Sequence, residues 1–401
     1  MALYAIPPAS APTQPTPFKV NIPDSDIADF KQLLKLSRVS KETYENVQTD
    51  RRFGVSREWI MNAKKVWESE FDWKKSESYI NTFPNFTIPV TTEAGSFTIH
   101  FIALFSTSPT ATPLLLLHGW PGNFLEFLPI LALLKEKYTD PAQLPYHVIV
   151  PSLPGYAFSS PPPLDREFAV RDVALVMDTL MHNLGFSSGS GYVAQGGDLG
   201  SEIAKVLGGG EFPSCKAVHV NVNFIISAPR GLSEKEQSFT EAEKKMLARG
   251  QAFITTGAAY AAEHGTRPST IGLVLGSSPL ALLAWIGEKY LEWTDTDPSL
   301  DAILESVSLY WYTQTFESSI YSYRTHFPPK DQQPMIAYVS VPYGFSNFPK
   351  EVVPVPKSWA AAAGNLVFYR EHDTGGHFAA LENPEVLLGD IEDFIAQVWK
   401  V

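Results

Sequence analysis

The chain has 401 residues, of which 44% are apolar, so it can bury a large core in one domain with attachments. A formal charge of −12 and a pI near 5.3 argue against binding to nucleic acid or to anionic membranes. Cys215 is the one cysteine, so no intrachain disulfide can form, which favours a reducing compartment. No apolar run reaches the length of about 18 residues that a membrane-spanning helix needs. We therefore expect a cytoplasmic protein without a membrane anchor.

The first predicted elements are amphipathic helices between residue 19 and about residue 90. Asp24 or Ser25 is in position to cap a segment whose apolar residues recur at helical spacing as far as Leu34. A second segment runs from Ser56 to Phe71 and contains two tryptophans, which predicts packing against a large surface. Residues 1–18 are rich in Pro, Ala and Thr and lack the pattern of a signal peptide, so they are expected to form a flexible arm.

From residue 97 onward the pattern changes to short β-rich runs. These are Phe97–Phe105, Pro113–Leu117, Tyr146–Val150, Tyr192–Ala194, Ala217–Phe224, Met335–Val341 and Leu366–Tyr369. Several runs are continuously apolar, and helical stretches at Val170–Leu184 and Ser201–Leu207 lie between them. Buried strands that alternate with helices predict a mostly parallel sheet covered by helices on both faces.

The alternation stops between residues 226 and 328, where helix signals dominate. Candidate capping boxes lie at Ser233-x-x-Glu236 and Thr240-x-x-Glu243, and Ser278-Pro279 opens an apolar helix that extends to Tyr290. Ligands of open α/β sheets bind beyond the carboxyl ends of the strands, so we expect this insertion to roof the site.

The chain is accordingly expected to divide into four parts. These are an N-terminal extension that packs on the core (1–92), the first part of the core (93–225), a helical cap (226–328) and the second part of the core (329–401). A closing helix is predicted after the last strand, with Asn383 as N-cap and Pro384 at its first position. Its predicted core face consists of Val386, Leu387, Ile391, Phe394 and Ile395.

The most informative motif is Gly196-Gly197-Asp198-Leu199-Gly200, between a predicted strand and a predicted helix. A sharp strand-to-helix turn needs glycines, because side chains there would collide with the neighbouring backbone. The nucleophile position of this turn holds Asp198 instead of serine. A carboxylate is already ionised at neutral pH, so it can attack saturated carbon without a base and form an ester that water must then cleave.

Three further candidate groups lie at strand ends. Two of them follow Asp198 in the chain, and together with it they give the order nucleophile, acid, histidine that this chemistry requires. His118-Gly-Trp-Pro-Gly122 follows the strand at 113–117, and the backbone amides of Trp120 and Leu199 are candidate oxyanion donors. Glu351 and His377 follow the last two predicted strands. His377 would activate water, while Glu351 would hold the ring's tautomer and stabilise the imidazolium.

Taken together, these motifs resemble the α/β-hydrolase epoxide hydrolases of the microsomal type, and most of all their soluble fungal members. The resemblance rests on Phe71-Asp-Trp73, Asn81-Thr-Phe-Pro-Asn-Phe86, His118-Gly-Trp-Pro-Gly122, Gly196-Gly-Asp-Leu-Gly200, Gly344-Phe-Ser-Asn-Phe-Pro349 and Gly375-Gly-His-Phe-Ala379. It extends over most of the chain, and the set of motifs is highly specific although each one alone is not.

The resemblance implies an α/β-hydrolase fold, with Asp198 as nucleophile, His377 as base and Glu351 as charge-relay acid. It also implies two cap tyrosines that hydrogen-bond the epoxide oxygen, and these fall on Tyr260 and Tyr323. Phenols can donate a hydrogen bond or a proton to the alkoxide that ring opening leaves. Some fungal relatives carry aspartate in place of Glu351, which changes the reach of the acid.

The resemblance also implies water and a small epoxide as reactants, a vicinal diol as product, and no metal or organic cofactor. The aromatic-rich cap region favours an apolar or aryl epoxide. A homodimer is expected from the resemblance alone.

Several alternatives remain open in the sequence. Glu371 and Asp373 compete with Glu351 for the acid, and Tyr310, Tyr312 and Tyr321 compete with Tyr323. His372 and His377 could form a metal pair, although zinc sites need three or four ligands. A haloalkane dehalogenase shares the aspartate nucleophile, but Leu199 has no side-chain donor for a halide. A non-catalytic scaffold that binds a hydrophobic ligand is a third reading.

Overall fold

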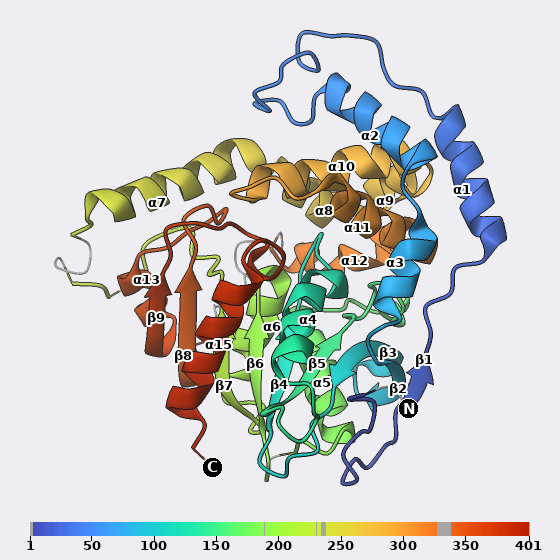
Figure 1. The fold of residues 1–401 in the computed structure, drawn as a ribbon. Helices are drawn as coiled ribbons and strands as arrows, with labels where there is room; N and C mark the ends of the chain where they lie inside the picture. The colour runs from blue at the N-terminus through green and yellow to red at the C-terminus, as the bar shows by residue number, and fades with distance from the viewer. Residues whose placement is uncertain (1–2, 188, 230, 234–237, 327–337, 401) are drawn as a thin grey trace.

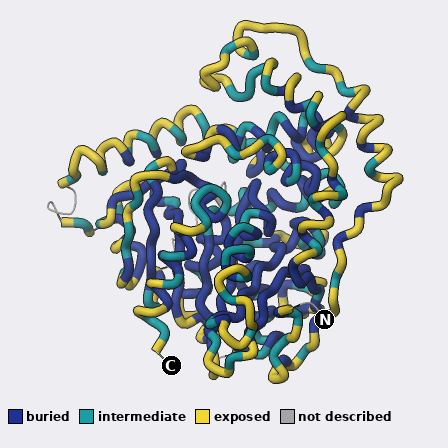
Figure 2. The backbone as a smooth tube through the Cα atoms, in the orientation of Figure 1, coloured by how far each residue is buried: buried dark blue, intermediate teal, exposed yellow. Residues whose placement is uncertain are grey.

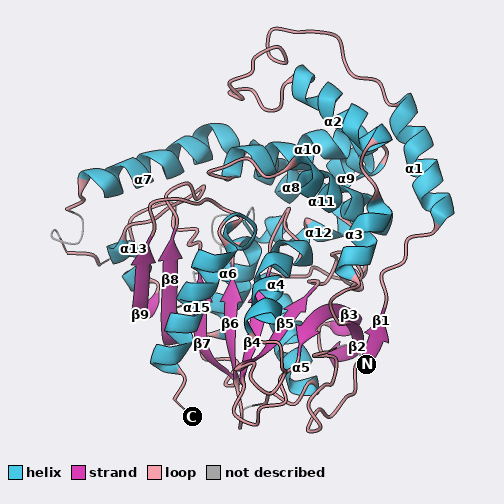
Figure 3. Ribbon diagram, viewed as in Figure 1, coloured by secondary structure: helices cyan, strands magenta, loops and turns pink. Residues whose placement is uncertain are grey.

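In the computed structural model, the described residues are 3–187, 189–229, 231–233, 238–326 and 338–400. They contain a nine-stranded sheet of order β1-β2-β3-β5-β4-β6-β7-β8-β9 (Figures 1 and 3). Strands β3 to β9 are Gly95–Leu104, Thr112–Leu117, Tyr146–Pro151, Tyr192–Gly196, Cys215–Val220, Val339–Asn347 and Gly364–Glu371; β1 is Thr16–Phe18 and β2 is Asn85–Thr92. The strands β5, β4, β6, β7, β8 and β9 pair in parallel, in that spatial order. β1, β2 and β3 join this sheet in antiparallel fashion.

Helices cover both faces of this sheet. One face carries α5 (Val170–Asn183), α6 (Asp198–Leu207) and α13 (Lys357–Ala362); the other carries α4 (Leu128–Lys137), α14 (Ala379–Glu382) and α15 (Pro384–Val398). In the central strand β4, Leu115 and Leu117 belong to the core on the α5–α6 side, whereas Leu114 and Leu116 belong to the core on the α4–α15 side. A strand that is buried on both faces must be apolar throughout, which explains the continuous run in the sequence and the buried centre of the molecule in Figure 2.

A layer of helices lies over the carboxyl ends of the strands (Figure 1). It consists of α7 (Glu241–Ala252), a π-helical turn (Phe253–Gly257), α8 (Ala259–Thr266), α9 (Pro268–Gly276), α10 (Pro279–Trp293), α11 (Leu300–Thr313), α12 (Phe316–Ser319) and a 3-10 helix, η3 (Tyr321–His326). The capping box at Thr240 and Glu243 is confirmed, since each backbone amide binds the other residue's side chain. The second candidate box includes Glu236, which lies outside the described residues.

No single described helix is long and apolar enough to cross a membrane. The pair α9 and α10 passes that test of length and composition only when taken together, and it is bent by 117°.

The N-terminal region differs from the sequence prediction. Three helices are present, α1 (Asp24–Leu36), α2 (Arg57–Ser69) and α3 (Trp73–Ile80), but the predicted helicity is wrong at residues 85–92, which form β2. Isoleucine, valine and threonine dominate that segment, and pairing with β3 buries its alternate side chains. α1 and α2 pack on α10 of the helical layer, and α2 also contacts α11, where Trp67 Nε1 donates to Ser308 Oγ at 3.0 Å. The four-part division of the chain stays a prediction.

Two further element predictions need correction. The strand predicted at 335–341 begins at Val339 and runs to Asn347, so Glu351 lies four residues beyond it; residues 335–337 lie outside the described part. Pro342 lacks an N–H, but the pairing with β9 shifts register between Val339 and Tyr343 and so accommodates it within the strand. In the closing helix, Asn383 makes no side-chain cap and Val386 is 39% exposed, whereas the remaining predicted core residues are buried.

Candidate active site

The turn between β6 and α6 presents Asp198 at the centre of the carboxyl edge of the sheet. Its φ of +47° lies in the left-handed region, a strained conformation for a residue with a side chain. A Cβ on Gly196 would lie 2.2 Å from the carbonyl oxygen of Gly200, and a Cβ on Gly200 would lie 2.1 Å from that of Leu117. The prediction that the backbone crowds the flanking glycines is therefore confirmed.

The two oxygens of the Asp198 carboxylate have different partners. The backbone N–H of Trp120 donates to Oδ1 at 2.7 Å, while Oδ2 lies 3.2 Å from Nε2 of His377. Gly119 makes this approach possible, because a Cβ there would lie 2.2 Å from Oδ1. The peptide between Trp120 and Pro121 is cis.

His377 lies between two carboxylates. Nδ1 is 2.7 Å from Oε1 of Glu351, which also accepts the backbone N–H of Val352 at 2.6 Å. The side chains of Glu351 and His377 are 1% and 2% exposed, so neither exchanges its partner for bulk water. Burial by itself lowers the pKa of His377, but the close carboxylates of Glu351 and Asp198 outweigh it and raise that pKa to about 10. His377 is consequently an imidazolium as long as Asp198 is ionised.

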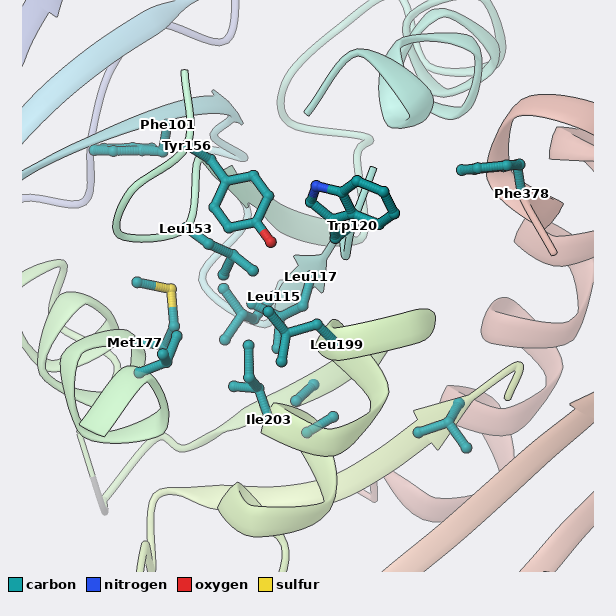
Figure 4. Packing of buried hydrophobic residues seen from close by; sticks show 14 of the residues in the cluster. Phe101, Leu115, Leu117, Trp120, Leu153, Tyr156, Met177, Leu199, Ile203 and Phe378 are labelled. Atoms are coloured by element: carbon teal, nitrogen blue, oxygen red, sulfur yellow. The ribbon is translucent and has the colours of Figure 1, made fainter. Parts of the chain in front are cut away.

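The two candidate oxyanion donors are the backbone amides of Trp120 and Leu199. The amide of Trp120 already binds Oδ1 of Asp198. Leu199 is the second residue of α6, so its amide belongs to the first helical turn, where N–H groups have no acceptor within the helix. Its oxyanion role stays a prediction. Figure 4 shows the Leu199 side chain among Leu117 and Ile203, beneath the indole of Trp120.

Tyr260 of α8 and Tyr323 of η3 meet above Trp120. The Tyr260 ring stacks on the Trp120 indole with centroids 5.3 Å apart, and the Tyr323 ring lies edge-on to both at 5.7 Å. The two phenols share a side-chain hydrogen bond. Burial raises the pKa of Tyr260, and so does the charge of Asp198. Burial raises the pKa of Tyr323 as well, so both phenols remain protonated donors at neutral pH.

The competing tyrosines are engaged elsewhere. The hydroxyl of Tyr310 donates to the carbonyl of Gly122 at 3.1 Å, and the Tyr312 ring packs on Trp73 and Phe30 of the N-terminal region. Tyr321 packs edge-on against Phe168. Of the tyrosines that the sequence left open, Tyr323 is the one whose ring contacts Trp120 and Tyr260.

The competing acids and His372 likewise have different surroundings from Glu351 and His377. Glu371 and Asp373 are both exposed. His372 Nε2 lies 2.6 Å from Asp390, on a different carboxylate from either partner of His377. Among the residues that the structure describes, no group of three or more His, Cys, Asp or Glu side chains could hold a metal ion.

Comparison with known proteins places this arrangement in a family. The model described as "Epoxide hydrolase N terminus" matches residues 15–127, and the alpha/beta hydrolase fold model matches residues 112–248. The structure of Aspergillus niger epoxide hydrolase aligns with a TM-score of 0.92 at 52% identity, covering 99% of this chain and 100% of that one. Epoxide hydrolase 1 of Sus scrofa is 31% identical over 94% of this chain and 88% of its own length. A Dothistroma septosporum protein whose name also assigns it to this class is 44% identical, with coverage of 98% and 92%.

The chain belongs to the epoxide hydrolases. It has the α/β-hydrolase fold that the sequence predicted, and it is an enzyme that hydrolyses small-molecule epoxides. This decides against the haloalkane dehalogenase and the non-catalytic scaffold.

Several residues of this epoxide hydrolase surround the site without having been found in the sequence. Arg249 of α7 donates to the carbonyls of Lys350 and Glu351 at 2.7 and 2.8 Å, so α7 holds the loop that carries Glu351. The Trp293 ring lies edge-on to the His377 imidazole at 4.9 Å. The buried ammonium of Lys289 lies 4.6 Å from the centroid of Tyr260. None of the three stands in a motif, and only the folded cap brings them to the core.

Proposed function

We propose that this epoxide hydrolase opens its substrate through a covalent ester on Asp198. The observation that carries the proposal is the unequal environment of the two carboxylate oxygens: the Trp120 amide binds Oδ1, which leaves Oδ2 to attack. Oδ2 forms a bond to an oxirane carbon and the C–O bond of the ring breaks. The resulting alkoxide takes a proton from the tyrosine pair, since both phenols are protonated.

The ester changes the state of His377. Esterification removes the charge of Asp198, one of the two carboxylates that raise the pKa of His377, so this pKa falls. The imidazolium gives up its proton, which restores the phenol that protonated the alkoxide, and the neutral Nε2 can then accept a proton from water. Water attacks Cγ of Asp198, and the oxyanion develops on Oδ1 beside the Trp120 amide. The bond between Cγ and Oδ2 breaks, and the diol leaves with Oδ2.

Every group in this route is a side chain or a backbone amide of the chain, so we propose that the reaction uses no metal or organic cofactor. Glu351 holds Nδ1 of His377 and stabilises the imidazolium in each half-reaction. Aromatic rings of Trp120, Tyr260, Tyr323 and Trp293 wall the site, which supports an apolar or aryl epoxide as substrate. A homodimer and a cytoplasmic location remain part of this proposal, on the resemblance and the single buried cysteine respectively.

A single turnover in heavy-oxygen water tests the ester route. Enzyme in excess over substrate is expected to release a first diol that carries an unlabelled oxygen from Asp198. Solvent oxygen enters the carboxylate instead, and proteolysis followed by mass spectrometry locates the label in the peptide that contains Asp198. Direct appearance of solvent oxygen in the first diol would refute the route.

Removal of one cap phenol is expected to slow ester formation. Tyr260→Phe and Tyr323→Phe each remove one donor to the alkoxide and leave the ring that packs on Trp120, so each alkylation rate falls about 10²-fold. The double variant loses more than either single one. Stopped-flow quenching of tryptophan fluorescence on mixing with substrate measures alkylation, and Tyr312→Phe, whose ring packs on Trp73, is the matched control. Unchanged alkylation in the double variant would contradict the assignment.

A further inference from the structure

A small cavity lies directly behind the nucleophile. Gly119, Gly122, Glu126, Asp198, Asn221 and His377 contribute to its lining. Its volume is about 20 Å³, enough to hold at least one buried water molecule. Tyr260 and Tyr323 do not line it, so it opens to the Asp198 carboxylate from a side other than the one where the epoxide oxygen is bound.

Glu126 is the unexpected member of this lining. It belongs to the 3-10 helix η1 (Phe124–Phe127), whose other residues are apolar and buried. Its carboxyl group folds back over the glycine loop, where a Cβ on Gly122 would lie 2.6 Å from Oε2. Among the described residues the side chain has no hydrogen-bond partner, and no Lys or Arg pairs with it. The residue is half-buried, and a carboxyl group that bonds no protein group requires another polar partner, which a polar cavity supplies as water.

The electrostatics of Glu126 are tied to the reacting groups. Burial raises the pKa of Glu126 to about 8, with the charge of His377 opposing the rise and that of Asp198 adding to it. The charge of Glu126 also raises the pKa of three tyrosines, but their hydroxyls donate to other groups. Tyr156 donates to Ser319, Tyr290 to Ser306 and Tyr310 to Gly122. None of them therefore competes with water for the carboxylate.

We propose that Glu126 is a positioning residue that holds the hydrolytic water in this cavity, between its carboxylate and Nε2 of His377. This inference rests on the ester route proposed above. One O–H of the water donates to Glu126 and the other to His377, which leaves an oxygen lone pair free to attack Cγ of Asp198. The proton of the second O–H passes to Nε2 as the new C–O bond forms. It passes on to the departing diol oxygen as the bond between Cγ and Oδ2 breaks.

The remaining proton of the water stays on the new carboxyl group of Asp198. It returns to His377 when the carboxylate is restored, since that charge raises the pKa of His377 again. Glu126 therefore gains and loses no proton over the cycle. It acts through the orientation of water, and its effect is confined to ester cleavage.

Transient kinetics of two Glu126 variants test this role. Glu126→Leu fills the site with an apolar side chain, and we expect the rate constant of ester hydrolysis to fall about 10- to 100-fold, the range for loss of a hydrogen bond to a charged group. Alkylation is expected to stay within about twofold. Glu126→Gln keeps one acceptor and should fall between the wild type and Glu126→Leu. Glu136→Gln, at an exposed position of α4, is the matched control.

The pH dependence of hydrolysis provides a readout that packing alone would not move. In the wild type, the hydrolysis rate constant should rise as Glu126 ionises, above the usual range of a carboxyl group because burial raises its pKa, and this limb should disappear in Glu126→Gln. Equal losses in alkylation and hydrolysis, or hydrolysis unchanged in Glu126→Leu while the ester still forms, would overturn the role of Glu126. Failure of the wild type to form any ester would instead overturn the covalent route itself.

Discussion

Asp198→Asn is expected to abolish diol formation, with a loss of about 10⁴-fold or more, the scale seen when a catalytic nucleophile is removed. The amide is neutral and a poor nucleophile toward saturated carbon, while its size preserves the contact with the Trp120 amide. The left-handed φ of +47° should also be retained, because asparagine tolerates that region better than most residues. Diol release from an apolar epoxide, measured by chromatography, gives the rate.

The control for that variant is Asp165→Asn. Asp165 is exposed on a surface loop, so this substitution removes the same charge at a position away from the site. It should retain full activity. Binding of a non-reactive amide analogue of the substrate should survive in Asp198→Asn, which shows that the site is still assembled. Activity of Asp198→Asn within tenfold of the wild type would mean that another group opens the ring.

His377→Gln is expected to trap the ester. Alkylation depends on Oδ2 of Asp198 and on the two phenols, whereas cleavage depends on the base, so hydrolysis should slow about 10²- to 10⁴-fold while the first half-reaction survives. Loss of the imidazolium also removes the positive neighbour of Asp198, 3.2 Å from Oδ2, so the attacking carboxylate is no weaker as a nucleophile. One equivalent of substrate should be consumed quickly, and the intact protein should gain the mass of one substrate molecule.

His372→Gln is the matched control, because His372 lies at the same end of the sheet but binds Asp390 at 2.6 Å and not the nucleophile. At a temperature where both variants are folded, His372→Gln should turn over repeatedly without an accumulated ester. Rapid and complete diol formation by His377→Gln would remove His377 from the role of base.

The elements that carry the chemistry were readable from local patterns. Continuous apolar runs predicted several buried strands of the parallel sheet, and Gly196, Gly197 and Gly200 predicted the sharp turn that exposes Asp198. The strand that precedes Glu351 was placed several residues too early, because Pro342 interrupts the pattern and a register shift in the sheet absorbs the interruption. β2 was missed for a related reason, since its stability comes from pairing with β3 and not from its own periodicity.

By itself, the sequence determined the fold class and the existence of a helical layer, and it predicted Asp198 as nucleophile and His377 as base, since each depends on residues that are neighbours in the chain. Only the tertiary structure decided which acid reaches His377, which tyrosine joins Tyr260, and that Arg249 and Glu126 lie against the site. The physical reason is distance along the chain. Glu351 and Tyr323 differ from their competitors by where packing places them. Burial raises the pKa of Glu126, and nearby carboxylates raise that of His377, only when remote segments close around these groups.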